Sequence, residues 1–208
     1  MYLSGRPTVD WYLDAITAAV QEARAASGQE AVSLVAHSAG GWLCRVWLQA
    51  NPGEVANISV VSLGSPLRPP PTDVAGVIDQ TRGILTYVAA NCPGPADGVP
   101  WVCVAGRFIR GSESLSPDVS AWVAGQGYKQ VCGLQTAWGD GITPTDWALL
   151  PGAEHVVLDG VFHSPVGADD NGRPWYGSSS ILPRWVHHLT GKPSADAVAA
   201  AAATNALA

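Results

Sequence analysis

The sequence predicts an α/β fold in which a parallel sheet lies between layers of helices, giving three layers. Short apolar runs alternate with segments of helical periodicity, the order in which crossover helices join parallel strands. Only 13% of the residues are charged and 47% are hydrophobic, which suits a sheet that is buried on both faces. The length of 208 residues favours one domain with a sizeable core.

The chain is expected to open with a helix, a strand and a second helix. The first helix is predicted over residues 8–27, where Thr8 can cap it and Gly28 can end it in a left-handed conformation. The apolar, β-branched run at 31–35 is typical of a buried strand. Helical character returns at 42–48, directly after a tight turn.

The rest of the chain continues this alternation around one irregular region. Residues 106–137 are predicted to form a lid-like insertion over the sheet edge, with one helix near 117–124. The domain is expected to span 1–192, followed by an Ala-rich tail at 193–208. Further strands are expected at 58–63, 101–105 and 156–159, and further helices at 73–90 and 181–189.

The charge balance argues against two classes of partner. The net charge is −6 and no run of Lys or Arg occurs, so we expect no nucleic-acid partner and no attraction to anionic membranes. Residues 1–11 lack the features of a signal peptide, and no apolar stretch reaches the ~18 residues of a transmembrane helix. The expectation is a soluble protein without stable membrane insertion, in the cytoplasm or a plastid.

The four cysteines do not match a metal site, because no Cys-x-x-Cys pair occurs. Cys44 and Cys103 lie in apolar runs and are expected in the core. Cys92 and Cys132 lie nearer to loops and could pair in an oxidising compartment, so both redox states stay open. We expect no metal and no other cofactor.

The segment Ala36-His37-Ser38-Ala39-Gly40 has the pattern of a nucleophile elbow, a sharp turn between a strand and a helix. Small residues flank the serine because the turn is strained and crowded. Small residues also surround serines in ordinary turns, but the strand before and the helix after favour an elbow. Ser38 is therefore the predicted nucleophile, and the amide of Ala39 the predicted oxyanion donor.

A serine nucleophile needs a base, and His163 is the preferred candidate among five histidines. It follows the last predicted strand, in a loop that can reach the elbow. His37 adjoins the nucleophile in sequence, so its side chain leaves in another direction and is expected to pack near the cleft. His155 precedes a strand, and His187 and His188 fall in the predicted closing helix.

The acid of the triad is expected between nucleophile and base in chain order. Asp140 fits because glycines flank it in a turn that can aim a carboxylate. Asp146, six residues later, is the alternative. Asp118 lies too early in the chain, and Asp159 lies within a strand. The acid would hold the imidazole of the base in the correct tautomer.

These motifs resemble those of lipase-type α/β-hydrolases. The likeness rests on the elbow with the following Gly41-Trp42, on Leu63-Gly64-Ser65-Pro66, on Gly139-Asp140-Gly141 and on His163-Ser164, and it covers about residues 8–190. It is closest to the plant and algal hydrolases similar to PGAP1-like deacylases and lipases. The resemblance implies hydrolysis of a small-molecule or lipid ester through an acyl-enzyme, without a cofactor.

The chain departs from this family at its N-terminal side. Only about 30 residues precede the first predicted strand, where a complete α/β-hydrolase has several strands and the loop that supplies a second oxyanion amide. The sheet is therefore expected to be partial, and the strand at 31–35 to be an exposed edge. Because one oxyanion donor is typically worth ~10²–10³ in rate, activity could be weak or lost.

Two alternatives to ester hydrolysis stay open. An acyltransferase would use the same triad, and apolar surroundings formed by Trp42, Trp101 and Trp138 would favour transfer over hydrolysis. A catalytically impaired fragment or binding module on the same scaffold is the other possibility. Neither the ester nor the oligomeric state follows from the sequence.

Overall fold

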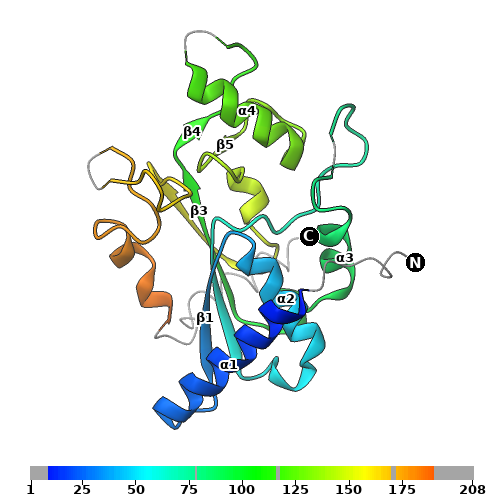
Figure 1. Cartoon of the computed structure of the whole chain (residues 1–208), viewed down its shortest axis with the longest axis vertical. Helices are drawn as coiled ribbons and strands as arrows, with labels where there is room; N and C mark the ends of the chain where they lie inside the picture. The colour runs from blue at the N-terminus through cyan, green and yellow to red at the C-terminus, as the bar shows by residue number, and fades with distance from the viewer. Residues whose placement is uncertain (1–8, 78, 116–117, 170–171, 190–208) are drawn as a thin grey trace, which may run out of the picture.

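The computed structural model describes residues 9–77, 79–115, 118–169 and 172–189 and confirms the α/β fold (Figure 1). Its centre is a parallel sheet of four strands in the order β1-β2-β3-β6. Each strand lies in register with the next, so their carboxyl ends meet at one edge of the sheet. The strands are β1 (Val32–His37), β2 (Ile58–Leu63), β3 (Trp101–Arg107) and β6 (Glu154–Asp159).

Alternate residues of β2 point to two different cores, one on each face of the sheet. Ile58 and Val60 pack with α1 (Asp10–Ser27) and α2 (Gly40–Ala50), through core residues such as Trp47. Val61 and Leu63 face the opposite side, which the C-terminal segment covers with Tyr176, Ile181 and Trp185. The third layer is therefore thin, built from the 3-10 helices η4 (Leu182–Arg184) and η5 (Val186–Leu189).

The insertion after β3 lies beyond the carboxyl ends of the strands (Figure 1). It contains the hairpin β4 (Ile109–Arg110) and β5 (Trp138–Gly139) and the helix α4 (Val119–Cys132). Asp118 caps α4 by accepting hydrogen bonds from two amides of its first turn. The helix continues well past the predicted 117–124, because its two glycines are helical.

Two predicted helices are only partly confirmed. The helix expected at 73–90 is reduced to α3 (Ile84–Asn91), because Gly76 and Gly83 have positive φ angles and Asp79 accepts the amides of Thr81 and Gly83 in a turn. The helix expected at 181–189 is two 3-10 helices, with a proline near the start of the first. The predicted tail at 193–208 lies outside the described residues.

The burial of the cysteines and the position of the edge strand can also be compared with what the sequence predicts. Cys44 and Cys103 are buried, as predicted, and Cys92 and Cys132 are buried as well. Strand β1 lies at one edge of the described sheet and leaves the side chain of Val35 47% exposed. None of the described helices combines the length and the apolar character needed to span a membrane.

Candidate active site

The elbow forms where β1 ends and α2 begins. Ser38 has a φ of 54°, a left-handed conformation that is strained for a residue with a side chain. Its amide donates to the carbonyl of Leu63 at 3.0 Å, which extends the pairing of β1 with β2 by one residue. Backbone pairing thus holds the strained serine in place.

The glycines after Ser38 are needed for close packing. A Cβ atom on Gly41 would lie 2.5 Å from the hydroxyl of Ser65, and one on Gly40 would lie 3.4 Å from the Cβ of Ala36. The start of α2 therefore packs directly against the ends of β1 and β2. The sequence pattern of small residues reflects this contact.

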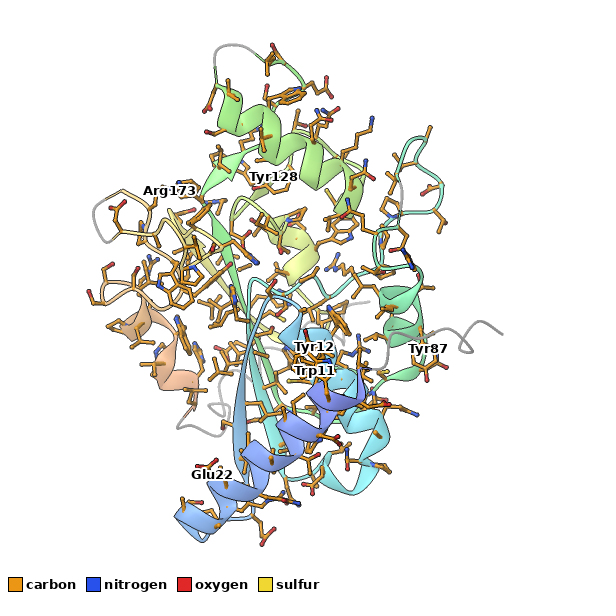
Figure 2. All side chains as sticks on the ribbon, viewed as in Figure 1. Trp11, Tyr12, Glu22, Tyr87, Tyr128 and Arg173 are labelled. Carbon is orange, nitrogen blue, oxygen red and sulfur yellow. The ribbon has the colours of Figure 1, made fainter. Side chains whose placement is uncertain are left out.

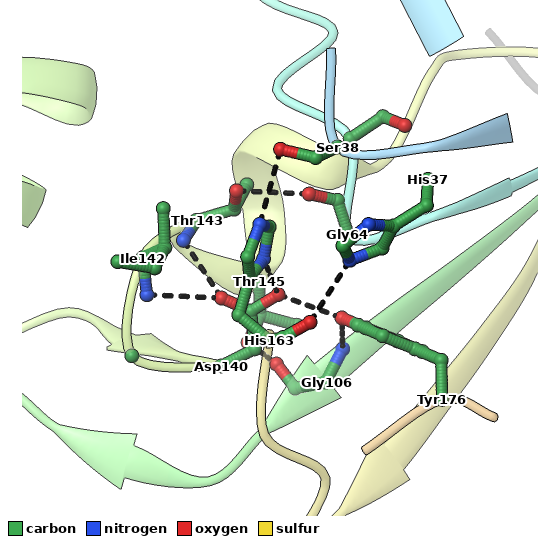
Figure 3. A network of polar contacts seen from close by, with 12 residues as sticks. His37, Ser38, Gly64, Gly106, Asp140, Ile142, Thr143, Thr145, His163 and Tyr176 are labelled. Carbon is green, nitrogen blue, oxygen red and sulfur yellow. Dashed lines mark hydrogen bonds and ion pairs between the residues drawn. The ribbon is translucent and has the colours of Figure 1, made fainter. Parts of the chain in front are cut away.

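The structure brings the three predicted triad residues together (Figure 3). The Nε2 atom of His163 lies 3.0 Å from the Oγ atom of Ser38, and its Nδ1 atom lies 2.7 Å from Oδ2 of Asp140. With Nδ1 protonated, the imidazole donates to the carboxylate and accepts from the serine hydroxyl. His163 and Asp140 are buried, at 6% and 1% exposure, so water has little access to their contact.

The carboxylate of Asp140 accepts four hydrogen bonds. Its Oδ1 accepts the amides of Ile142 at 3.0 Å and Thr143 at 2.7 Å. Its Oδ2 accepts the Nδ1 proton of His163 and the hydroxyl of Tyr176, the latter at 2.8 Å. These donors compensate a charge that is almost completely removed from solvent.

Two glycines make room for that carboxylate. A Cβ atom on Gly64, whose φ is +56°, would lie 2.5 Å from Oδ2 of Asp140. A Cβ atom on Gly106 would lie 2.9 Å from the Cβ of Asp140 and 2.5 Å from a backbone carbonyl. Glycines thus occupy the residue after β2 and the penultimate residue of β3, where the acid has to fit.

His163 is fixed through its backbone as well as its ring. Its amide donates to the carbonyl of Asp140 at 2.9 Å, and its own carbonyl lies 2.9 Å from Nε2 of His37. Because a carbonyl only accepts, His37 carries its proton on Nε2. Burial, and then the nearby His163, lower the pKa of His37, so it stays a neutral donor at the edge of the site. This agrees with the predicted packing of His37 near the cleft.

Two tyrosines of the site had no signal in the sequence. Tyr176 donates to Asp140, as described above, and Tyr128 projects from α4 toward the ends of the strands (Figure 2). The hydroxyl of Tyr128 accepts the amide of Gly141 at 2.8 Å and lies 3.3 Å from the carbonyl of Ile109. These three partners of the hydroxyls lie between 13 and 36 residues away in the chain, so no local sequence pattern predicts the contacts.

The other candidate acids lie outside the triad. Asp146 is exposed in the 3-10 helix η3 (Thr145–Ala148). Asp159 pairs with Arg107. Asp118 caps α4, as described above.

The other candidate bases also lie elsewhere. His155 bonds to the carbonyl of Leu150, and His188 lies 3.4 Å from a carboxylate oxygen of Glu154. His187 packs against the ring of His188.

The amide of Ala39 directly follows the nucleophile and precedes the first turn of α2. No residue in the described ranges accepts a hydrogen bond from it, which leaves it available to a ligand beside Ser38.

The prediction that Trp101 lines the cleft is wrong. Trp101 begins β3, at the amino end of the strand, and its indole donates to Ser62 within the core. Trp138 is 47% exposed. Among described residues, no group of three His, Cys, Asp or Glu side chains could hold a metal ion.

Comparisons with known proteins support the fold alone. No protein-family model matches the chain, and no curated protein sequence matches it. The chain is similar in structure to the product of the gene lin2722 from Listeria innocua, with a TM-score of 0.51 and 15% identity. The similarity covers 91% of this chain and 69% of that one. At this identity the match concerns the arrangement of strands and helices.

Proposed function

We propose that this chain is a serine hydrolase of the α/β-hydrolase superfamily that cleaves carboxylic esters through an acyl-enzyme on Ser38. One observation carries the proposal: a continuous hydrogen-bonded chain runs from Ser38 through His163 to Asp140, and it begins at a serine with a φ of 54°. A serine in an ordinary turn needs neither the strain nor the two partners.

Acylation follows from the positions of these atoms. The Oγ atom of Ser38 attacks the ester carbonyl carbon while Nε2 of His163 takes its proton. The carbonyl oxygen becomes an oxyanion that the amide of Ala39 and the N-terminus of α2 can stabilise. When the intermediate collapses, the carbon–oxygen bond to the alcohol breaks, and the protonated His163 gives its proton to the departing oxygen. Ser38 then carries the acyl group.

Deacylation repeats these steps with water. His163 takes a proton from a water molecule, whose oxygen attacks the acyl carbon, and the bond to the Oγ atom of Ser38 then breaks with return of the proton. Asp140 stays ionised and stabilises the imidazolium in both halves. An alcohol in place of water would give acyl transfer, but Trp101 lies in the core and does not help to exclude water from the cleft.

The likeness of the motifs to PGAP1-like deacylases and lipases supports a lipid ester as substrate. The exposed apolar side chains near the insertion are compatible with that class, among them Trp138 and Ile142, at 47% and 56% exposure. Hydrolysis of p-nitrophenyl esters of increasing acyl length, with and without an added alcohol, measures both chain preference and transfer.

Labelling with a fluorophosphonate probe tests the nucleophile. We expect wild type and Ser164→Ala to be labelled and Ser38→Ala to remain unlabelled. Ser164 is the matched control because it adjoins the base without contacting the nucleophile, its hydroxyl accepting the amide of Val166. Circular dichroism confirms that each variant is folded. Folded wild type that does not react, or label that persists in Ser38→Ala, would refute the proposal.

A further inference from the structure

Tyr176 is the one side chain besides His163 that bonds to the carboxylate of Asp140 among described residues. Its hydroxyl lies 2.8 Å from Oδ2 of Asp140 and 2.8 Å from the amide nitrogen of Gly106 (Figure 3). The amide can only donate, so the single hydroxyl proton points to the carboxylate. The direction of both hydrogen bonds is therefore fixed by the chemistry of the partners.

We propose that Tyr176 is a positioning residue of the triad, which holds Oδ2 of Asp140 in place for His163. The role rests on the proposed function. Within the described residues, the hydroxyl of Tyr176 bonds to Asp140 and to the amide of Gly106 and not to Ser38, so it acts through Asp140.

The surroundings keep this hydroxyl protonated and still. Tyr176 is completely buried, and its burial, followed by the charge of Asp140, raises its pKa well above the usual value. The indole of Trp185 donates to the carbonyl of Tyr176 at 2.8 Å. The ring of Tyr176 belongs to the core cluster that contains Val61 and Val104. Its acceptor contact with Gly106 ties it to the end of β3, a central strand.

The two oxygens of Asp140 are held by different kinds of donor. Backbone amides of its own turn hold Oδ1, as they would in many Asx turns. Oδ2 is shared by His163 and Tyr176 alone among described residues, so the phenol competes directly for the charge that stabilises the imidazolium. Removing the phenol leaves that charge to His163.

The other titratable and charged groups nearby do not reach Oδ2. His37 contacts the carbonyl of His163, and Tyr128 contacts the amide of Gly141. The guanidinium of Arg173 lies over the ring of Phe162, 4.0 Å from its centroid. Within the described ranges, His163 is the one basic side chain that lies within 4.0 Å of the Asp140 carboxylate.

Tyr176→Phe and Tyr128→Phe form a matched pair for the test. Both substitutions remove the hydroxyl of a completely buried tyrosine beside the turn that carries Asp140, but Tyr128 bonds to backbone only. We expect Tyr176→Phe to move the NMR signal of the Nδ1 proton of His163, because Oδ2 of Asp140, which accepts that proton, loses its other donor. Tyr128→Phe should leave that signal unchanged.

With a p-nitrophenyl ester, kcat should fall roughly tenfold in Tyr176→Phe, because the carboxylate is no longer held in place for His163. A merely structural role would lower stability in both variants and leave the His163 signal in place, and that result would overturn the proposal, as would equal shifts of the signal in both variants. The NMR measurement needs no turnover, so it separates this proposal from the proposed function, which fails when wild type does not react with the fluorophosphonate.

Discussion

At the scale of single residues, the absence of a side chain at Gly64 leaves the space that the carboxylate of Asp140 occupies. The φ of +56° at Gly64 puts the backbone directly behind Asp140, with no room for a side chain. Gly28 has a similar φ of +67° at the end of α1, where an added Cβ atom would meet nothing within 4 Å. An alanine would be strained by the positive φ at both positions, but its methyl group would clash with neighbouring atoms only at position 64.

Gly64→Ala should therefore lower kcat/KM for ester hydrolysis by about 100-fold, because a displacement of the carboxylate by about 1 Å misaligns the base. It should also lower the free energy of unfolding by about 1–2 kcal/mol or more through strain. Gly28→Ala should show the strain alone, with unchanged kcat/KM. Steady-state kinetics and urea unfolding measure both, and full activity in Gly64→Ala would contradict the assigned packing.

At the scale of elements, α2 and α3 are joined by a buried arginine. Arg45 of α2 is 7% exposed, and its guanidinium donates to the carbonyls of Cys92 at 2.7 Å and Pro93 at 3.0 Å. These carbonyls follow the C-terminus of α3, where a cation is favourable. Burial lowers the pKa of Arg45, because the charged guanidinium is less stable away from water.

Arg45→Met should lower the free energy of unfolding by about 1–3 kcal/mol, because it leaves two carbonyls without their donor. Arg45, Cys92 and Pro93 all line a cavity of about 770 Å³, and water entering it in the variant would reduce the loss toward the lower end of that range. Arg45→Lys, with one compact head group, should recover part of the loss. Urea unfolding measures the three proteins, while fluorophosphonate labelling of Ser38 should be the same in all. Equal stability of wild type and Arg45→Met would show that the contacts contribute nothing.

Elements with a strong local pattern were predictable, and those settled by distant contacts were not. The strand at 58–63 agrees with β2 residue for residue, and the elbow follows from its small residues. The helix at 73–90 failed because Asp79 and two glycines favour turns over apolar periodicity. Chain order and the shared carboxyl edge of the strands were enough to select Asp140 and His163. Tyr176 could not be selected, since its bond to Asp140 joins residues 36 apart and depends on how the third layer packs.

At the scale of the whole molecule, the two edges of the described sheet differ in charge. Strand β6 carries Glu154 and Asp159 at its ends, whereas β1 contains no Asp, Glu, Lys or Arg. Val35 of β1 points to the face covered by the C-terminal segment, yet it remains 47% exposed. Nearby, the carbonyl of Leu189 accepts the hydroxyl of Ser33, so η5 covers only part of this edge. An edge strand with an exposed β-branched residue and no such charge is a site for pairing between copies.

We expect concentration-dependent association through β1, and a charge on this edge should suppress it. Val35→Glu should lower the apparent mass at high concentration in sedimentation or light scattering, because two copies would bring like charges together at the paired edges. Val166→Glu is the matched control: this valine is 82% exposed in a loop, and the substitution changes the net charge from −6 to −7 in the same way. It should associate as wild type does. If both variants dissociate equally, net charge is responsible rather than the edge. If wild type stays monomeric at every concentration, β1 does not act as a pairing edge in this molecule.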